Sequence, residues 1–245
     1  MQLDVVDLRD FYATPLGQVA RRMLSRRVRA HWRPGRVGTL IGLGYATPYL
    51  GSFRGDALRL GALMPSQQGA IVWPPAGKTS SVLVEEDRLP LPDACVDRLL
   101  CVHSLEVAER PAVFLRELWR VLTPEGSLLM IVPNRRGVWA RTDATPFGQG
   151  RPYSRGQLET LLKSALFTPV EWGSALHFPP LGKRMLLRSA GAWERAGAKF
   201  GSAFAGVIIV EARKEMVAPI GKPATARALR ELVAVQRSIC VVGGH

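Results

Sequence analysis

The segment Arg36–Phe53, RVGTLIGLGYATPYLGSF, constrains the fold more than any other part of the chain. Its apolar run Val37–Ile41 predicts a strand, Gly42–Ala46 a glycine turn, and Pro48 the start of a short helix. A strand that enters a glycine turn at a helix N-terminus brings bare backbone and a positive dipole close to a ligand, as in nucleotide-like cofactor sites. The GxGxA pattern is shorter than GxGxxG, so by itself it is equally consistent with a simple tight turn.

Strands and helices alternate after this segment, which predicts crossover connections and a parallel sheet. A helix begins before it at Thr14-Pro15, an N-cap followed by proline, and Ser154–Gln157 is a capping box. The predicted strands are 57–63, 71–73, 81–84, 96–102, 127–132, 170–178 and 205–212, and further helices follow Pro111 and Ser154 and span 185–200.

The pattern divides the chain into an N-terminal capping segment, residues 1–36, an α/β domain, residues 37–213, and a mobile basic tail, residues 214–245. Within the domain, residues 133–153 form a long polar connection. Connections of this length in a compact domain are typical of lids and substrate loops.

Composition excludes several classes of protein. No apolar run is long enough to cross a bilayer, and the acidic N-terminus lacks the features of a signal peptide, so a cytoplasmic protein is expected. The three cysteines and four histidines show no metal-ligand spacing, so no metal is expected. The net charge of +13 favours acidic partners such as phosphorylated metabolites or nucleic acid, although many basic enzymes carry such a charge without binding either.

The order of three motifs resembles class I S-adenosylmethionine-dependent methyltransferases, in particular the small-molecule branch typified by quinone-biosynthesis methylases. These motifs are the glycine turn, the loop Leu89-Pro90-Leu91-Pro92-Asp93 and the segment RELWRVLTPEGSLL, residues 116–129. The resemblance implies a Rossmann-like, doubly wound α/β sheet of seven strands, mostly parallel with an antiparallel last strand. It also implies S-adenosylmethionine as the cofactor.

The resemblance assigns roles to individual residues. The turn would pass under the methionine part of the cofactor, the acidic loop after the 81–84 strand would face the adenine, and Tyr12 would cover the cofactor from the N-terminal segment. The alternative for Tyr12 is a residue that packs the N-terminal helix onto the sheet. The implied cofactor-binding residues are Gly42, Leu43, Gly44, Tyr45, Met64, Glu85, Glu86, Asp87 and Tyr12.

His103 follows the buried 96–102 strand and is the candidate catalytic base, although a histidine that caps the strand is the simpler interpretation. Glu106 and Asp143 are weaker alternatives for the base. Arg135, Arg136 and Tyr153 belong to the long connection and would favour a small anionic substrate. Similar enzymes place carboxylates where Leu40 and Met64 stand here. The sequence therefore predicts methyl transfer to a small or acidic molecule. The alternatives are a catalytically silent binding or regulatory protein and a nucleic-acid methylase or binder.

Overall fold

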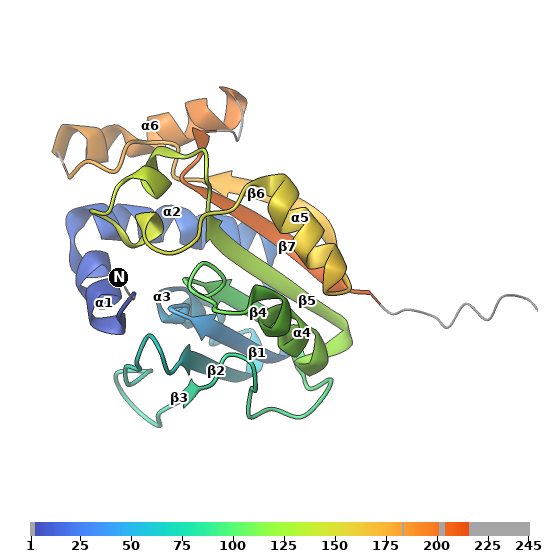
Figure 1. The fold of residues 1–245 in the computed structure, drawn as a ribbon. Coiled ribbons are helices and arrows are strands. Elements are labelled where there is room, and N and C mark those ends of the chain that lie inside the picture. The colour runs from blue at the N-terminus through green and yellow to red at the C-terminus, as the bar shows by residue number, and fades with distance from the viewer. Residues whose placement is uncertain (1–2, 183, 201–203, 216–245) are drawn as a thin grey trace, which may run out of the picture. The chain divides into compact units, whose positions relative to one another are not determined.

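A computed structural model describes residues 3–182, 184–200 and 204–215. Its centre is a seven-stranded sheet with the order β3-β2-β1-β4-β5-β7-β6 (Figure 1). The first five strands are parallel, and β7 runs antiparallel to both of its neighbours, β5 and β6. The strands are β1 Val37–Gly44, β2 Ala57–Pro65, β3 Ser81–Val84, β4 Val96–Val102, β5 Leu122–Pro133, β6 Phe167–Ala175 and β7 Val207–Lys214.

This topology confirms the predicted fold class. One predicted strand, residues 71–73, is absent. Its backbone is satisfied by a side chain instead of a neighbouring strand, because the Ser81 hydroxyl accepts from Trp73 N at 3.0 Å and donates to Ile71 O at 2.8 Å. The predicted 170–178 strand starts earlier, at Phe167, because pairing with β7 already begins there, opposite Lys214.

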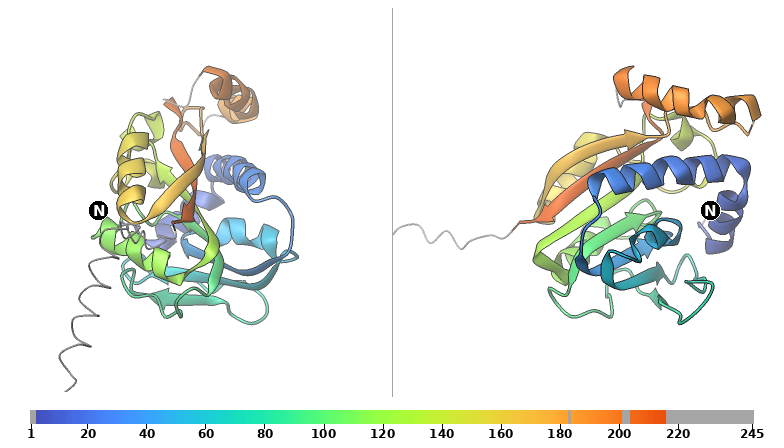
Figure 2. Two further views of the ribbon diagram at one scale, coloured as in Figure 1. Left: turned by 90° about the vertical axis from the view of Figure 1, so that its right-hand side faces the viewer. Right: turned by 180° about the vertical axis from the view of Figure 1, so that it is seen from behind.

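Helices cover both faces of the sheet. The right-hand view of Figure 2, from behind, places α2 along one face of the sheet, whereas α4 and α5 cover the opposite face (Figure 1). The sequence predicted α2 with its Thr14 cap but missed the shorter α1, whose N-cap Asp4 accepts from Val6 N at 2.7 Å. The α-helices are α1 Val5–Ala13, α2 Pro15–His31, α3 Thr47–Leu50, α4 Pro111–Val121, α5 Arg155–Ser164 and α6 Arg184–Phe200, and the 3-10 helices are η1 Gly51–Phe53, η2 Val138–Arg141 and η3 Pro146–Gly148.

The apolar side chains form two clusters separated by the sheet. Alternate residues of β1 enter different clusters: Leu40 packs with α1 and α2, and Leu43 packs with α4 and α5. Burial on both faces explains why β1, β4 and β5 are nearly continuous apolar runs.

None of the described helices is both long and apolar enough to span a bilayer. The predicted tail, residues 214–245, lies outside the described residues from residue 216 onward. The predicted division at residues 36 and 213 stays a prediction.

Candidate functional site

The glycine turn ends β1 and is tightly enclosed by protein atoms. Gly44 has a φ of +74°, and a Cβ at this position would lie 2.3 Å from the carbonyl oxygen of Val102 in β4. A Cβ at Gly42 would lie 2.7 Å from the Cβ of Ala46 and 2.8 Å from Leu50. Both glycines are therefore required for close packing of β1 against β4 and α3, independently of any ligand.

Three tyrosines gather at this turn. The Tyr12 ring, from α1, stacks on the Tyr45 ring with centroids 5.5 Å apart. Its hydroxyl lies 2.9 Å from the Tyr49 hydroxyl and 2.9 Å from His103 Nε2. The structure thus brings Tyr12, Tyr45 and His103 together at the carboxyl ends of β1 and β4, and the roles predicted for them toward cofactor and substrate stay predictions.

His103 continues this chain of polar contacts into the protein. Its Nδ1 lies 3.2 Å from Glu106 Oε1, and the two side chains are 0% and 1% exposed. Neither Glu106 oxygen accepts a hydrogen bond from any described residue. Because a neighbouring carboxylate favours a proton on Nδ1, we assign Nε2 as the acceptor that faces the Tyr12 hydroxyl.

This assignment orders the whole chain of contacts. With Nε2 as the acceptor, Tyr12 donates its one hydroxyl proton to His103, which leaves the Tyr49 hydroxyl as the donor to the Tyr12 oxygen. Burial raises the pKa of Tyr12 well above 10, and burial also raises the pKa of Tyr49. Both phenols are therefore neutral donors at physiological pH.

A cavity of 530 Å³ adjoins Glu106 at the ends of β2 and β4. This volume falls in the range of about 300–1,000 Å³ typical of small-molecule sites. Glu86, which the sequence placed near an adenine, accepts from the backbone N–H of Glu109 on the cavity wall, and burial raises the pKa of Glu86. The lining residues are Leu3, Pro65, Gln67, Gln68, Glu106, Val107, Ala108, Glu109, Gly150, Arg151 and Pro152.

The other predicted cofactor residues are occupied by contacts within the protein. Leu43 is buried in the core cluster under α4 and α5, and Met64 Sδ accepts from Ile71 N at 3.2 Å. Asp87 pairs with Arg110, whereas Glu85 is exposed and only its backbone forms a bridge, with Arg88.

The segment RELWRVLTPEGSLL, residues 116–129, has a structural role. Arg120 of α4 bonds both oxygens of Glu117, at 2.6 and 2.9 Å, and donates to the carbonyl oxygens of Leu89 and Leu91, while Asp93 also accepts from it. The hydrogen bond from Arg120 lowers the pKa of Glu117. The RELWRVL segment thus holds the LPLPD loop onto α4.

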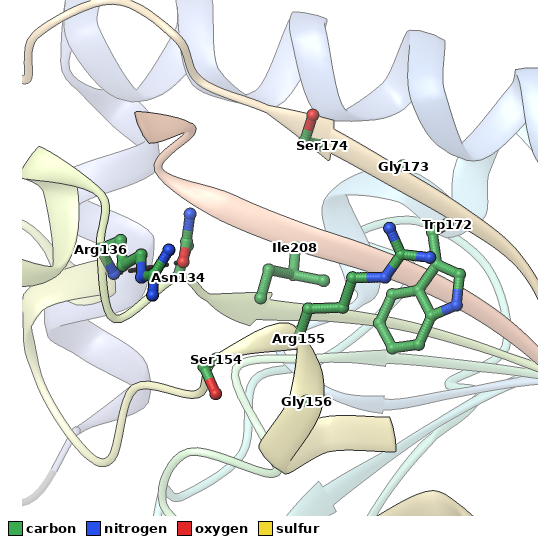
Figure 3. A pocket seen from close by; sticks show the side chains of 9 residues that line it. All are labelled: Asn134, Arg136, Ser154, Arg155, Gly156, Trp172, Gly173, Ser174 and Ile208. Atoms are coloured by element: carbon green, nitrogen blue, oxygen red, sulfur yellow. Dashed lines mark hydrogen bonds between the residues drawn. The ribbon is translucent and has the colours of Figure 1, made fainter. Parts of the chain in front are cut away.

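The predicted substrate residues do not share one cavity. Arg136 lines a separate cavity of 390 Å³ between the end of β5, the start of α5 and the β6–β7 pair (Figure 3). Arg155, also on this wall, stacks over Trp172 at 4.7 Å. Arg135 is exposed, whereas Tyr153 is buried with its hydroxyl 3.5 Å from Leu105 O. The sequence offered Glu106 only as a weaker alternative base, whereas the structure pairs it with His103 at an i, i+3 spacing.

A further cavity bears on the nucleic-acid alternative. Its volume is 610 Å³, and arginines of α2 line it together with residues of α3 and η1. Such a surface suits phosphate groups, which are common to all nucleic acids and carry no sequence information. Nucleic-acid binding therefore stays a prediction. The arginines are Arg21, Arg22, Arg26 and Arg29, of which Arg29 is paired with Asp56.

Comparison with known proteins identifies the fold. Residues 64–130, from the end of β2 through most of β5, match the family model described as a methyltransferase domain. The fold is that of the class I S-adenosylmethionine-dependent methyltransferases. No curated protein sequence matches the chain.

Solved structures of low sequence identity share this methyltransferase fold. One is a complex between the Haloferax volcanii Trm112 methyltransferase activator and its methyltransferase partner, with 16% identity, coverage of 86% of this chain and 98% of that chain, and a TM-score of 0.62. The [4+2]-cyclase SpnF has 23% identity, covers 82% of each chain and has a TM-score of 0.57. Burkholderia thailandensis 1,6-didemethyltoxoflavin-N1-methyltransferase, bound to its named substrate and S-adenosylhomocysteine, has 16% identity, covers 86% of this chain and 82% of that chain, and has a TM-score of 0.52.

The Burkholderia thailandensis neighbour is bound to S-adenosylhomocysteine, so the site here is compared with the needs of S-adenosylmethionine, the cofactor implied by the resemblance. The residues present fit its charge, because Glu106 is a buried carboxylate without a hydrogen bond from any described residue, beside a cavity of sufficient volume. They do not supply carboxylates at the expected positions, since Leu40 and Met64 are both buried and apolar. Glu86, Glu106 and Glu109 are the acids that lie in or beside the cavity wall.

Proposed function

We propose that the chain transfers a methyl group from S-adenosylmethionine to a small anionic molecule. The observation that carries this proposal is the buried series Glu106–His103–Tyr12 at the carboxyl ends of β1 and β4. In open α/β sheets this edge is where ligands bind. A buried carboxylate that holds an imidazole is also a recurrent arrangement for general-base catalysis.

In the proposed site, Glu106, Glu109 and Glu86 would hold the cationic cofactor, with Gln67 and Gln68 on the same wall. The bound cofactor supplies an electrophilic methyl group. Arg136 and Arg155 would attract the anionic substrate to the cavity that they line. Arg135 and Tyr153, the other predicted substrate residues, belong to the same connection.

His103 is the proposed base for the substrate proton. Its Nε2 faces the Tyr12 hydroxyl, so a substrate hydroxyl or amine that takes the place of this phenol would meet the same nitrogen. The Glu106 carboxylate would then stabilise the imidazolium that forms. Helix α1 carries Tyr12 and would exclude water from the reacting groups.

A second function, a binding or regulatory protein without catalysis, is favoured by the position of Tyr12. Its ring stacks on Tyr45 at the glycine turn, where the resemblance places the methionine part of the cofactor. The absence of acids at positions 40 and 64 supports the same alternative. The [4+2]-cyclase with this fold illustrates that the fold alone does not determine the reaction.

Calorimetric titration of the whole chain with S-adenosylmethionine and S-adenosylhomocysteine distinguishes the two functions. We expect both to bind, and the sulfonium form to bind more tightly, because only it carries the extra positive charge toward the glutamates. Absence of heat with both ligands at submillimolar concentration would support the silent binding protein. For the methylating protein, His103→Gln should abolish turnover of accepted substrates while retaining cofactor binding.

A further inference from the structure

Three ionisable side chains converge on the α2 face of the sheet, apart from the site described above. His31 is the last residue of α2, Glu171 lies in β6, and Glu211 lies directly opposite Glu171 in β7. His31 Nδ1 is 3.3 Å from a Glu171 oxygen and 3.6 Å from a Glu211 oxygen. One potential ligand atom from each residue lies within 4.8 Å of the other two.

The two distances from His31 match those between ligands around a metal ion, and the two glutamate oxygens lie within 4.8 Å of each other. Metal–ligand bonds of about 2.0–2.2 Å at tetrahedral angles place neighbouring ligand atoms about 3.4 Å apart. Charge-assisted hydrogen bonds between imidazolium and carboxylate are shorter, about 2.7–2.9 Å. His31 Nδ1 forms no hydrogen bond with any described residue, although the side chain is only 5% exposed.

Besides His31, no described cationic side chain forms an ion pair with Glu171 or Glu211. Two carboxylates directly opposite each other on paired strands repel. Arg98 is near Glu211, but these two residues form no ion pair within 4.0 Å, and the Arg98 guanidinium instead lies over the Trp32 ring at 5.4 Å. Gly173 lets the imidazole lie against β6, since a Cβ there would be 3.0 Å from His31 Nε2.

We propose that His31, Glu171 and Glu211 bind a divalent transition-metal ion, with Zn²⁺ as the best match. One imidazole and two carboxylates are ligands that Zn²⁺ accepts, and a water molecule completes a tetrahedron. Glu171 is 63% exposed, which gives the ion a path from solvent. The bound ion joins the end of α2 to the edge of the sheet at β6 and β7, and it stabilises the folded chain because the ligands are together only after folding.

Calorimetric titration of the chelator-treated full chain with Zn²⁺ tests the site, and Co²⁺ serves as a spectroscopic substitute. The variant Glu171→Gln removes one ligand from an exposed position, and Glu211→Gln removes another. The matched control is Glu159→Gln, which removes a partly exposed carboxylate on α5 that faces Lys163. We expect one Zn²⁺ to bind to the wild type and to the control, and the affinity to fall more than about tenfold in each of the two ligand variants.

Two further readouts separate binding here from binding elsewhere. The visible absorption of tetrahedral Co²⁺ should appear in the wild type and be lost in Glu171→Gln. Zn²⁺ should raise the unfolding temperature of the wild type and not that of the variant. Equal Zn²⁺ stoichiometry and affinity in the wild type and both ligand variants would overturn the proposal, as would no Zn²⁺ binding to the wild type. In either case the cluster is a contact between His31 and two glutamates that holds no metal ion.

Discussion

His103 and Glu106 are buried side by side, with Nδ1 3.2 Å from Oε1, yet the carboxylate receives no hydrogen bond from any described residue. A buried charge that is poorly satisfied costs stability, and such groups are retained at functional sites. We expect Glu106→Gln to raise the free energy of unfolding by about 1–2 kcal/mol. In the tautomer assigned above His103 carries one ring proton, on Nδ1, so the substitution leaves no opposite charge without a partner. Urea unfolding at pH 7.5 measures the change.

The same variant should weaken S-adenosylmethionine binding by about tenfold, equivalent to about 1.4 kcal/mol, and S-adenosylhomocysteine binding by less. The control for stability is Glu109→Gln, which removes an exposed carboxylate nearby and should change the free energy of unfolding by less than about 0.5 kcal/mol. A Glu106→Gln protein that unfolds more easily than the wild type would show that the pair is structural.

Tyr12 and Tyr49 predict a loss of stability at alkaline pH. Burial raises the pKa of both phenols above the value of about 10 expected in the unfolded chain. The folded protein therefore holds these protons more strongly, and the resulting stability is complete below pH 10 and decreases as the pH rises above 10. Above pH 10, and below its pKa in the folded protein, each phenol lowers the free energy of unfolding by about 1.4 kcal/mol per pH unit.

Urea unfolding at several pH values between 8 and 11.5 measures this slope. The double variant Tyr12→Phe/Tyr49→Phe keeps both rings and removes both hydroxyls, so its stability should fall less steeply above pH 10. Burial also raises the pKa of Tyr153 and Cys101, but these residues are present in both proteins, so they do not change the difference between the two slopes. Identical slopes in the two proteins would contradict this prediction.

Gly44 should tolerate no side chain. Its φ of +74° disfavours other residues, and an added Cβ would lie 2.3 Å from a backbone oxygen that cannot move independently of β4. We expect Gly44→Ala to lower the free energy of unfolding by at least about 2 kcal/mol. Gly51→Ala is the matched control, because Gly51 has a φ of −55° and no atom within 4 Å of an added Cβ. Equal free energies of unfolding of the two variants, measured in urea, would contradict the prediction and show that the β4 backbone can move away from the added Cβ.

The sequence predicted most of the sheet because the buried strands are apolar on both faces. Strands such as β3 and β4 have the predicted bounds, and the capping box at Ser154 is formed as expected. The apolar pattern predicted a strand wrongly at residues 71–73. There the backbone forms hydrogen bonds with the Ser81 side chain instead of with a neighbouring strand. Helix α1 was missed because its amphipathic pattern is weak and its anchor is remote: Val5 N donates to Gln68 O.

The sites were predictable only in part. Tyr12, Tyr45 and His103 could be placed together because the resemblance brings the N-terminal segment over the turn. The His31, Glu171 and Glu211 cluster was not predictable from spacing, since a helix end and two late strands supply one ligand each. Metal-ligand spacing in a sequence detects ligands on one local element and misses those that only the folded sheet assembles.

The position of β7 between β5 and β6 has a consequence for how the chain is made. Strand β6 has β7 as its sheet neighbour, and β7 is the last strand of the described chain. On the ribosome, Phe167–Ala175 must therefore wait without a partner, and β5 must keep one edge open, until Val207–Lys214 has emerged. Until then β5 has an open edge and β6 has no partner, so Val207–Lys214 decides whether the nascent chain closes its sheet or aggregates through it.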